Sequence, residues 1–149
     1  MLSLDQILNP EQLPPSRVPV PEWGGHAFIA NLTADGRDEV ETAWVAYRES
    51  REQEDSDQRG FRAYLVAATL CDDGGNLVFG TREAVATAAA KLAVKSAAVL
   101  TRLFTVSCAL NAFSKEDIEA LEKNCTAAQT PPTGSGPPKD AGSGESRSA

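Results

Sequence analysis

The feature that most constrains the fold is a series of side chains repeated at helical spacing in the second half of the chain. The steps between them alternate four and three residues, which places them on one face of an α-helix. The series is Leu92, Ser96, Val99, Leu103, Val106, Leu110 and Phe113, and Leu100 and Phe104 widen it. We expect this stripe to form the core of a helical domain. The many alanines between Ala84 and Ala98 would allow close helix approach, so self-association is a further possibility.

Four other segments have the capping residues and apolar spacing of helices. The first begins at Thr33 or Asp35, and the others follow Gly60, Thr81 and Ser114. The predicted inner faces are Val40, Trp44 and Tyr47 in the first, Phe61, Tyr64, Leu65 and Ala68 in the second, and Ile118 and Leu121 in the last. The chain is therefore predicted to be mainly helical.

The segment ahead of these helices has β-type residues on both sides of a glycine pair. Two valines precede Gly24 and Gly25, and Phe28 and Ile29 follow them. This pattern predicts a small β-hairpin or an extended arm. Prolines at positions 19 and 21 would be tolerated only at an edge strand or a bulge. Further upstream, the segment LDQIL can form a single helical turn, which Pro10 ends.

These patterns predict an α+β fold that is mainly α, with a small N-terminal β-hairpin or extended arm on a compact helical domain. We expect one domain over residues 1–124, with the arm at 1–33 and the helical body at 34–124. Residues 125–149 contain no leucine, isoleucine, valine or aromatic residue and are rich in Pro, Gly, Ser, Thr and Ala. Such a segment buries too little apolar surface to offset the entropy of ordering, so we expect a disordered tail.

The charge of the chain restricts its partners. The formal net charge is −7, and residues 35–57 carry nine acids against three arginines. An acidic body argues against nucleic acid, whose binding modules display basic surfaces. No apolar run approaches the roughly twenty residues that span a bilayer, and the first residues lack the basic region of a secretion signal. We therefore expect neither a nucleic acid nor a membrane as partner.

The reactive residue types are few. Three widely spaced cysteines, Cys71, Cys108 and Cys125, define neither a disulfide framework nor paired metal ligands, and a reducing cytoplasm is the simplest compartment. The chain has one histidine, His26, and no nucleophile-elbow sequence that could form a hydrolytic triad with it. We therefore expect His26 to be a surface side chain. The glycine pairs lack the spacing and lysine of a phosphate loop. The sequence predicts no enzyme, no cofactor and no metal.

The stretch CDDGGNLVF has two interpretations. Counted from Asp72, Glu83 falls at the twelfth position of a calcium-binding loop. However, the third position is a glycine and the sixth a leucine, so one ligand and the bend glycine are missing. The residues favour a turn over Asp72–Asn76 followed by a short extended segment, Leu77–Phe79. A cation-binding helical module using the 72–83 loop remains the less supported alternative.

Several segments, in this order, resemble the tail assembly chaperones of tailed bacteriophages. They are VPVPEWGGHAFIANLT, ADGRDEVE, RAYLVAATLCDDGGNLVF and KSAAVLTRLFTVSCALNAFSKEDIEALEKN. The resemblance covers roughly residues 1–124 and is most specific over Leu77–Asn124. It brings no catalytic residue with it.

The resemblance implies a non-enzymatic protein of the infected host cytoplasm that is absent from the mature virion. Such a chaperone binds the long tape measure protein, prevents aggregation of its apolar helices and recruits tail tube protein. In such families a ribosomal frameshift often adds a second domain, and the segment after Asn124 is either a linker to one or the end of the short form. The alternative is a structural component of the phage tail.

The resemblance includes no residue-level binding signature, so the candidate contact residues rest on physical grounds. Large apolar side chains at accessible positions dominate protein interfaces. The partner-binding candidates are Trp23 and Phe28 on the predicted arm, and those of Leu100, Leu103 and Phe104 that the fold leaves uncovered.

Overall fold

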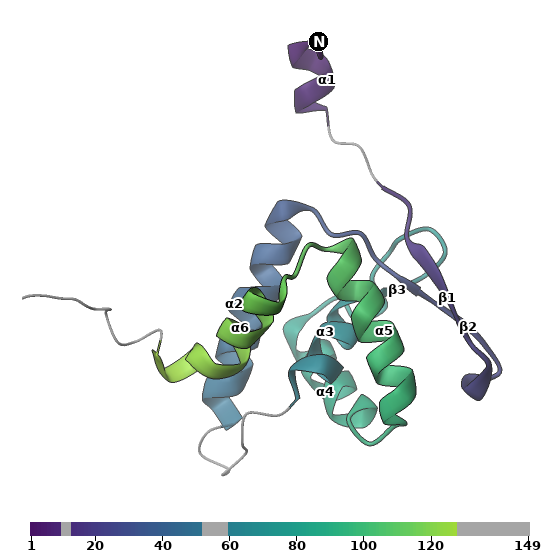
Figure 1. Ribbon diagram of the computed structural model, residues 1–149, viewed down its shortest axis with the longest axis vertical. Coiled ribbons are helices and arrows are strands. Elements are labelled where there is room, and N and C mark those ends of the chain that lie inside the picture. The colour runs from purple at the N-terminus through teal and green to yellow at the C-terminus, as the bar shows by residue number, and fades with distance from the viewer. Residues whose placement is uncertain (10–12, 52–59, 128–149) are drawn as a thin grey trace, which may run out of the picture.

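The computed structural model describes residues 1–9, 13–51 and 60–127. Its helices and strands, in chain order, are α1 (Leu4–Leu8), β1 (Ser16–Val20), the 3₁₀ turn η1 (Pro21–Trp23), β2 (Gly25–Ile29), α2 (Ala34–Arg51), α3 (Phe61–Thr69), β3 (Leu70–Cys71), α4 (Arg82–Leu92), α5 (Ala97–Leu110) and α6 (Lys115–Ala127) (Figure 1). The fold is mostly helical with a small antiparallel sheet, which confirms the predicted class.

The predicted hairpin is formed by β1 and β2. The strands pair antiparallel from Ser16 opposite Ile29 to Val20 opposite Gly25. The connecting turn needs a left-handed residue at Gly24, where φ is 82°, and glycine adopts that conformation without steric penalty. Because the sheet order is β1-β2-β3, Pro19 lies on an edge strand, as its missing N–H requires. The third strand, β3, was not predicted.

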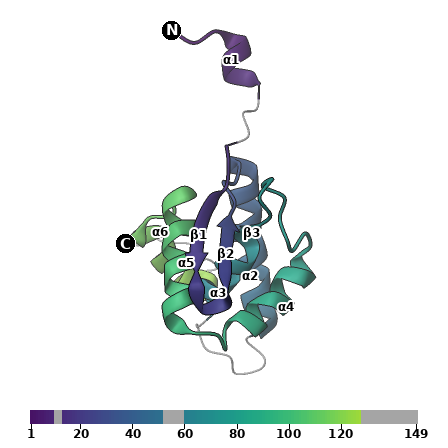
Figure 2. The same ribbon diagram turned by 90° about the vertical axis from the view of Figure 1, so that its right-hand side faces the viewer.

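Of the two predicted forms of this segment, a hairpin or an extended arm, the structure has the hairpin, and it packs against the helices. Val18, Val20 and Ile29 are buried. The strand β1 runs beside α5 (Figure 2), and Arg102 of α5 donates hydrogen bonds of 2.9 and 2.8 Å to the Glu22 carboxylate at the hairpin tip. The alternation of the strands turns the valines toward the helices, and their burial attaches the hairpin.

The centre of the body is α3. Eight of its nine residues are buried, and it packs against α2, α4 and α5 (Figure 1). The helix follows Gly60, whose φ of 112° is left-handed and favours glycine. A helix that is apolar on all sides is expected at such an interior position.

The two outer helices α2 and α6 begin where the capping signals predicted. The Thr33 hydroxyl accepts a 3.0 Å hydrogen bond from the Gly36 amide. Ser114 and Asp117 form a reciprocal pair, in which each backbone amide donates to the other's side chain at 3.0 and 3.1 Å. The helix α6 continues to Ala127, past the predicted boundary at 124. The rest of the predicted tail, 128–149, lies outside the described residues.

The apolar stripe of Leu92–Phe113 lies on two helices and a loop instead of one helix. Leu92 ends α4, residues 93–96 form a turn, and Phe113 lies between α5 and α6. The core assignment is nevertheless correct, because Val99, Leu103 and Phe113 are buried. Both α4 and α5 pack against α3, and the turn between them lets each helix place its apolar face there.

Among the described residues, no single helix is long and apolar enough to cross a membrane. Only α5 and Lys115–Glu122 taken together reach that length and composition, and they are bent by 115° at their junction.

Candidate functional site: an apolar cavity and an exposed apolar helix

The structure separates the predicted partner-binding residues into exposed and buried ones. Trp23, in η1, is 42% exposed, and Phe28 is half-buried with its ring edge-on to His26 at 5.3 Å. Leu100 and Leu103 are buried in the core, so the fold does not leave these two candidates uncovered.

The fifth candidate, Phe104, is half-buried. The guanidinium of Arg62 lies over its ring, 5.6 Å from the centroid. With two of the five residues in the core, the five do not form one exposed patch.

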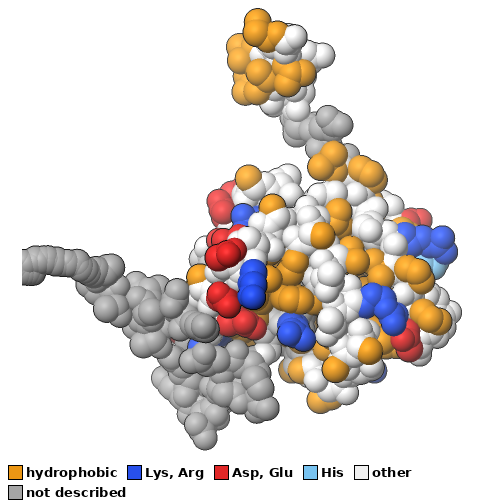
Figure 3. Space-filling view, viewed as in Figure 1, with side chains coloured by type: hydrophobic (Ala, Val, Ile, Leu, Met, Phe, Trp, Pro, Cys, Tyr) orange, Lys and Arg blue, Asp and Glu red, His pale blue; other side chains and the backbone are white. Residues whose placement is uncertain are grey.

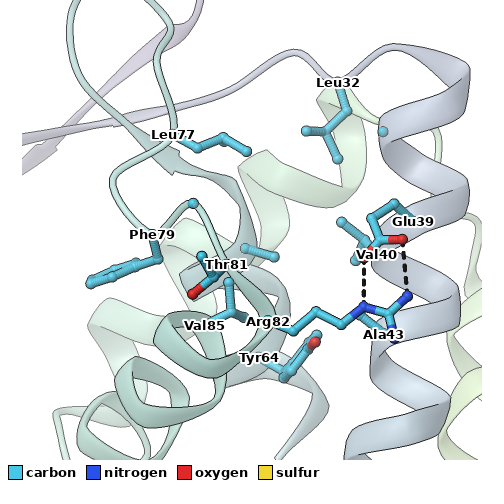
Figure 4. A pocket seen from close by; sticks show the side chains of 13 residues that line it. Leu32, Glu39, Val40, Ala43, Tyr64, Leu77, Phe79, Thr81, Arg82 and Val85 are labelled. Atoms are coloured by element: carbon cyan, nitrogen blue, oxygen red, sulfur yellow. Dashed lines mark hydrogen bonds and ion pairs between the residues drawn. The ribbon is translucent and has the colours of Figure 1, made fainter.

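A cavity of about 140 Å³ lies elsewhere, between α2, α3, α4 and the segment that precedes α4 (Figure 4). Its lining is mostly apolar, and Leu77 and Leu32 point into the same space from two sides. The lining residues are Leu32, Gly36, Glu39, Val40, Ala43, Tyr64, Ala68, Leu77, Phe79, Gly80, Thr81, Arg82 and Val85.

The segment that follows the CDDGGN turn, from Leu77 to Thr81, builds one wall of the cavity, and the stretch itself forms the predicted turn. Asp72 Oδ1 accepts hydrogen bonds of 2.9 Å from both the Gly74 and the Asn76 amides, which holds the pKa of this carboxyl below its ordinary value. The Val78 amide then donates to the Leu70 carbonyl at 2.9 Å. These bonds fold the segment back beside β3, where Leu77 forms an antiparallel bridge with Cys71 and lines the cavity.

The helix α2 supplies the opposite wall through residues of one face. Gly36, Glu39, Val40 and Ala43 follow the spacing of three and four residues that aligns side chains along a helix. Gly36 packs closely against the residues that precede α2, because a Cβ at this position would lie 3.3 Å from Thr33 Oγ1 and 3.6 Å from Leu32 Cβ.

An ion pair between Glu39 of α2 and Arg82 of α4 borders the cavity (Figure 4). Arg82 donates from Nε and Nη2 to the two carboxylate oxygens at 2.7 and 3.0 Å. This bidentate contact lowers the pKa of Glu39. Both side chains are about half exposed. Because water screens exposed ion pairs, this pair links α2 to α4 but contributes little to the free energy of unfolding.

The other polar groups of the lining do not form a reactive constellation. The Thr81 hydroxyl accepts a 3.1 Å hydrogen bond from the Ala84 amide and so caps α4. Burial raises the pKa of Tyr64 to about 12, so its phenol stays protonated at neutral pH. The cavity can therefore receive an apolar group.

A second apolar surface is α1, which stands clear of the body in this view (Figure 3). Its aliphatic residues Leu4, Ile7 and Leu8 are each between 59% and 70% exposed, and none of its residues is buried. Ser3 and Gln6 cap its N-terminus with a capping box. The Gln6 amide donates to Ser3 Oγ at 3.2 Å, and the Ser3 amide donates to Gln6 Oε1 at 2.9 Å. The sequence predicted this helical turn but not its exposure.

Within residues 1–9, 13–51 and 60–127, no three His, Cys, Asp or Glu side chains are grouped so that they could hold a metal ion. His26 is exposed and its Nδ1 lies 3.1 Å from Arg17 Nη2. Cys71 and Cys108 are free, and burial raises the pKa of Cys108 to about 11.

No family model, curated protein or solved structure matches the chain. The fold places the chain among small, mainly helical proteins with a three-stranded antiparallel sheet.

Proposed function

We propose that this protein is a non-enzymatic phage tail assembly chaperone. In this function it binds the tape measure protein in the host cytoplasm, keeps the apolar helices of that protein from aggregating and helps to recruit tail tube protein. The observation that carries the proposal is the exposed apolar helix α1.

An isolated helix of five residues is far below the roughly twelve residues at which helices become stable in water. The helix α1 also exposes three aliphatic side chains, although contiguous apolar surface is usually covered by a partner. Contact with another chain would stabilise both the helix and its apolar face.

The remainder of the chain is compatible with this function. A chaperone for apolar helices needs a charged body that stays dissolved while its apolar surface is occupied, and the chain has a formal net charge of −7. The sequence resemblance described above points to the same function.

The test is co-expression with the tape measure protein of the same genome, with and without this chain. We expect the tape measure protein to be soluble only in its presence, and the two to co-purify. The triple variant Leu4→Ser, Ile7→Ser, Leu8→Ser should lose this effect without a change in Tm, because these residues are not buried. The matched control is Val94→Ser on the α4–α5 turn, since Val94 is 84% exposed and lies outside α1.

A tape measure protein whose solubility is independent of this chain would contradict the proposal. Stoichiometric amounts of the chain in purified tails would instead support the alternative of a structural tail component.

A further inference from the structure

We propose that the cavity between α2, α3 and α4 is a recognition site for one bulky apolar side chain of an amphipathic helix that carries a basic residue one turn away. The inference rests on the proposed function in one respect, since the tape measure protein would then supply this helix. The arguments concern the cavity's size, the backbone around it and its charge.

The size of the cavity fits one side chain and not a metabolite. Small-molecule sites usually occupy roughly 300–1,000 Å³, whereas this cavity has about 140 Å³. A dry cavity of roughly 150 Å³ lined by aliphatic and aromatic groups accepts a molecule the size of benzene. A leucine, methionine or phenylalanine side chain has suitable dimensions.

The backbone around the cavity favours a helix as the partner. Three walls are helices, whose interior amides and carbonyls bond to one another. The fourth wall is the segment from Leu77 to Thr81, which contains none of the strands of the structure. No free strand edge lines the cavity within the described part of the chain. A helix, which satisfies its own backbone, can dock through side chains alone.

The charge beside the cavity favours a basic partner. Glu39 borders the cavity, and Asp35 lies one turn before it on the same flank of α2 and is exposed. Arg82 neutralises Glu39 but not Asp35. A lysine or arginine one turn from the inserted side chain would therefore meet a negative flank.

The mouth of the cavity is itself apolar and accessible. Leu77 is 44% exposed and points into the cavity, so docking of a helix would cover it. The helix α1 of a second copy is a poorer match, because its Asp5 would approach the acidic flank of α2.

The first test uses a labelled amphipathic peptide of leucine, alanine and lysine, about 18 residues long so that it forms a helix. Fluorescence anisotropy measures its affinity for the full chain. We expect Leu77→Ser to weaken binding by about tenfold or more, as loss of an interface anchor does. The matched control is Val78→Ser, since Val78 is 57% exposed but does not line the cavity. It should change the affinity by less than about twofold.

A second pair of variants tests the charge argument. Asp35→Lys should weaken binding and reduce its dependence on salt. Glu116→Lys, an exposed first-turn acid of α6, makes the same charge change away from the cavity and should have little effect. Equal binding of a peptide with glutamate in place of lysine would overturn the proposal.

The outcome is separable from that of the proposed function. If the tape measure protein co-purifies equally with wild type and Leu77→Ser, the cavity proposal fails and the chaperone function stands. If the lysine peptide binds as expected but the tape measure protein is unaffected, the chaperone function fails and the cavity proposal stands. A wild-type dimer that Leu77→Ser dissociates would assign the cavity to a second copy and overturn the proposal.

Discussion

The indole nitrogen of Trp44 lies 2.8 Å from the carbonyl oxygen of Leu121 and donates a hydrogen bond to it. Arg48, one turn further along α2, donates to the Leu121 and Glu122 carbonyls. The Trp44 ring also contacts Phe61 of α3, with 5.1 Å between centroids. One fully buried side chain thus joins α2 to both the central helix and α6.

Replacement of this residue should destabilise the protein. Trp44→Phe removes the indole donor and part of the buried ring, so we expect the free energy of unfolding to fall by about 2 kcal/mol. Urea denaturation measures the change. Trp23→Phe is the matched control, because Trp23 is exposed and should alter stability by less than about 0.5 kcal/mol. Equal losses in the two variants would contradict the assigned role of Trp44.

The buried amide of Asn111 connects the end of α5 to the chain that enters α2. Its Oδ1 accepts from the Leu32 amide at 2.7 Å, and its Nδ2 donates to the Ala30 and Ser107 carbonyls at 3.1 Å. Asn111→Ala leaves these groups without their side-chain partner, so we expect a loss of about 3 kcal/mol. Because Leu32 lines the cavity, peptide binding should weaken as well.

Thermal denaturation checks the expected loss. Asn31→Ala is the control, since the Asn31 side chain makes one exposed hydrogen bond, of 3.3 Å to the Pro14 carbonyl. If Asn31→Ala destabilises as much as Asn111→Ala, the buried network does not determine the effect.

Local signals predicted most helix positions in this chain. The caps at Thr33, Thr81 and Ser114 act through residues within three positions of them, and the sequence displays all of these. By contrast, β3 has only two residues, and the strand is defined by its pairing with β2 across the fold. Nothing in the sequence of Leu70–Cys71 distinguishes it from the end of the preceding helix.

The cavity could not be predicted from the sequence either, because it also depends on contacts between distant segments. Its walls come from segments near residues 32–43, 64–68 and 77–85, and only tertiary packing brings them together. The stripe of Leu92–Phe113 predicted one continuous helix, whereas the structure has two helices joined by a turn. Its spacing persists through the turn at residues 93–96 because both flanking helices face the same core.

The ion pair between Glu22 and Arg102 should be visible in a pH titration. The hydrogen bonds from Arg102 lower the pKa of Glu22 from 4.5 to about 2. Since the folded-state pKa is depressed, the stability that the ion pair contributes is fully present above pH 4.5 and is lost as the pH falls through about 2. Carboxyl ¹³C NMR follows this ionisation directly.

The variant Arg102→Gln should move the Glu22 midpoint toward 4.5. Arg62→Gln is the control, because Arg62 donates to the Thr101 hydroxyl at 3.3 Å instead. A Glu22 midpoint that Arg102→Gln leaves unchanged would show that another group lowers it.

Tyr64 should make the protein sensitive to alkaline pH. Burial raises its pKa from 10 to about 12, so the folded state retains the phenol proton more strongly than the unfolded state. The resulting stability is present below pH 10 and declines as the pH rises toward 12. A shift of this size corresponds to about 2–3 kcal/mol of unfolding free energy.

The variant Tyr64→Phe keeps the ring and removes the titrating group, so its stability should depend less on pH in this range. Burial also raises the pKa of Cys108, to about 11. The comparison is therefore made in a Cys108→Ala background, by urea denaturation at several pH values. Parallel pH profiles with Tyr64 and with phenylalanine would contradict the assignment.

The turn at Asp72 should be indifferent to calcium. Its Oδ1 already accepts two backbone hydrogen bonds of 2.9 Å, and Oδ2 accepts one of 3.3 Å from the Asn76 side chain. A calcium ion would need these oxygens as ligands. We therefore expect the same Tm in calcium and in a chelator. Asp72→Ala should lower Tm to the same extent in both conditions, because the turn loses its side-chain acceptor.

The control for this experiment is Asp73→Ala, which removes the neighbouring exposed carboxylate and leaves those three hydrogen bonds in place. If the turn did bind calcium, calcium at a hundredfold excess over its Kd would raise the free energy of unfolding by about 2.7 kcal/mol. A rise in Tm with calcium that Asp72→Ala abolishes would return the 72–83 segment to the cation-binding interpretation. Calcium binding would then affect the wall of the cavity that contains Leu77.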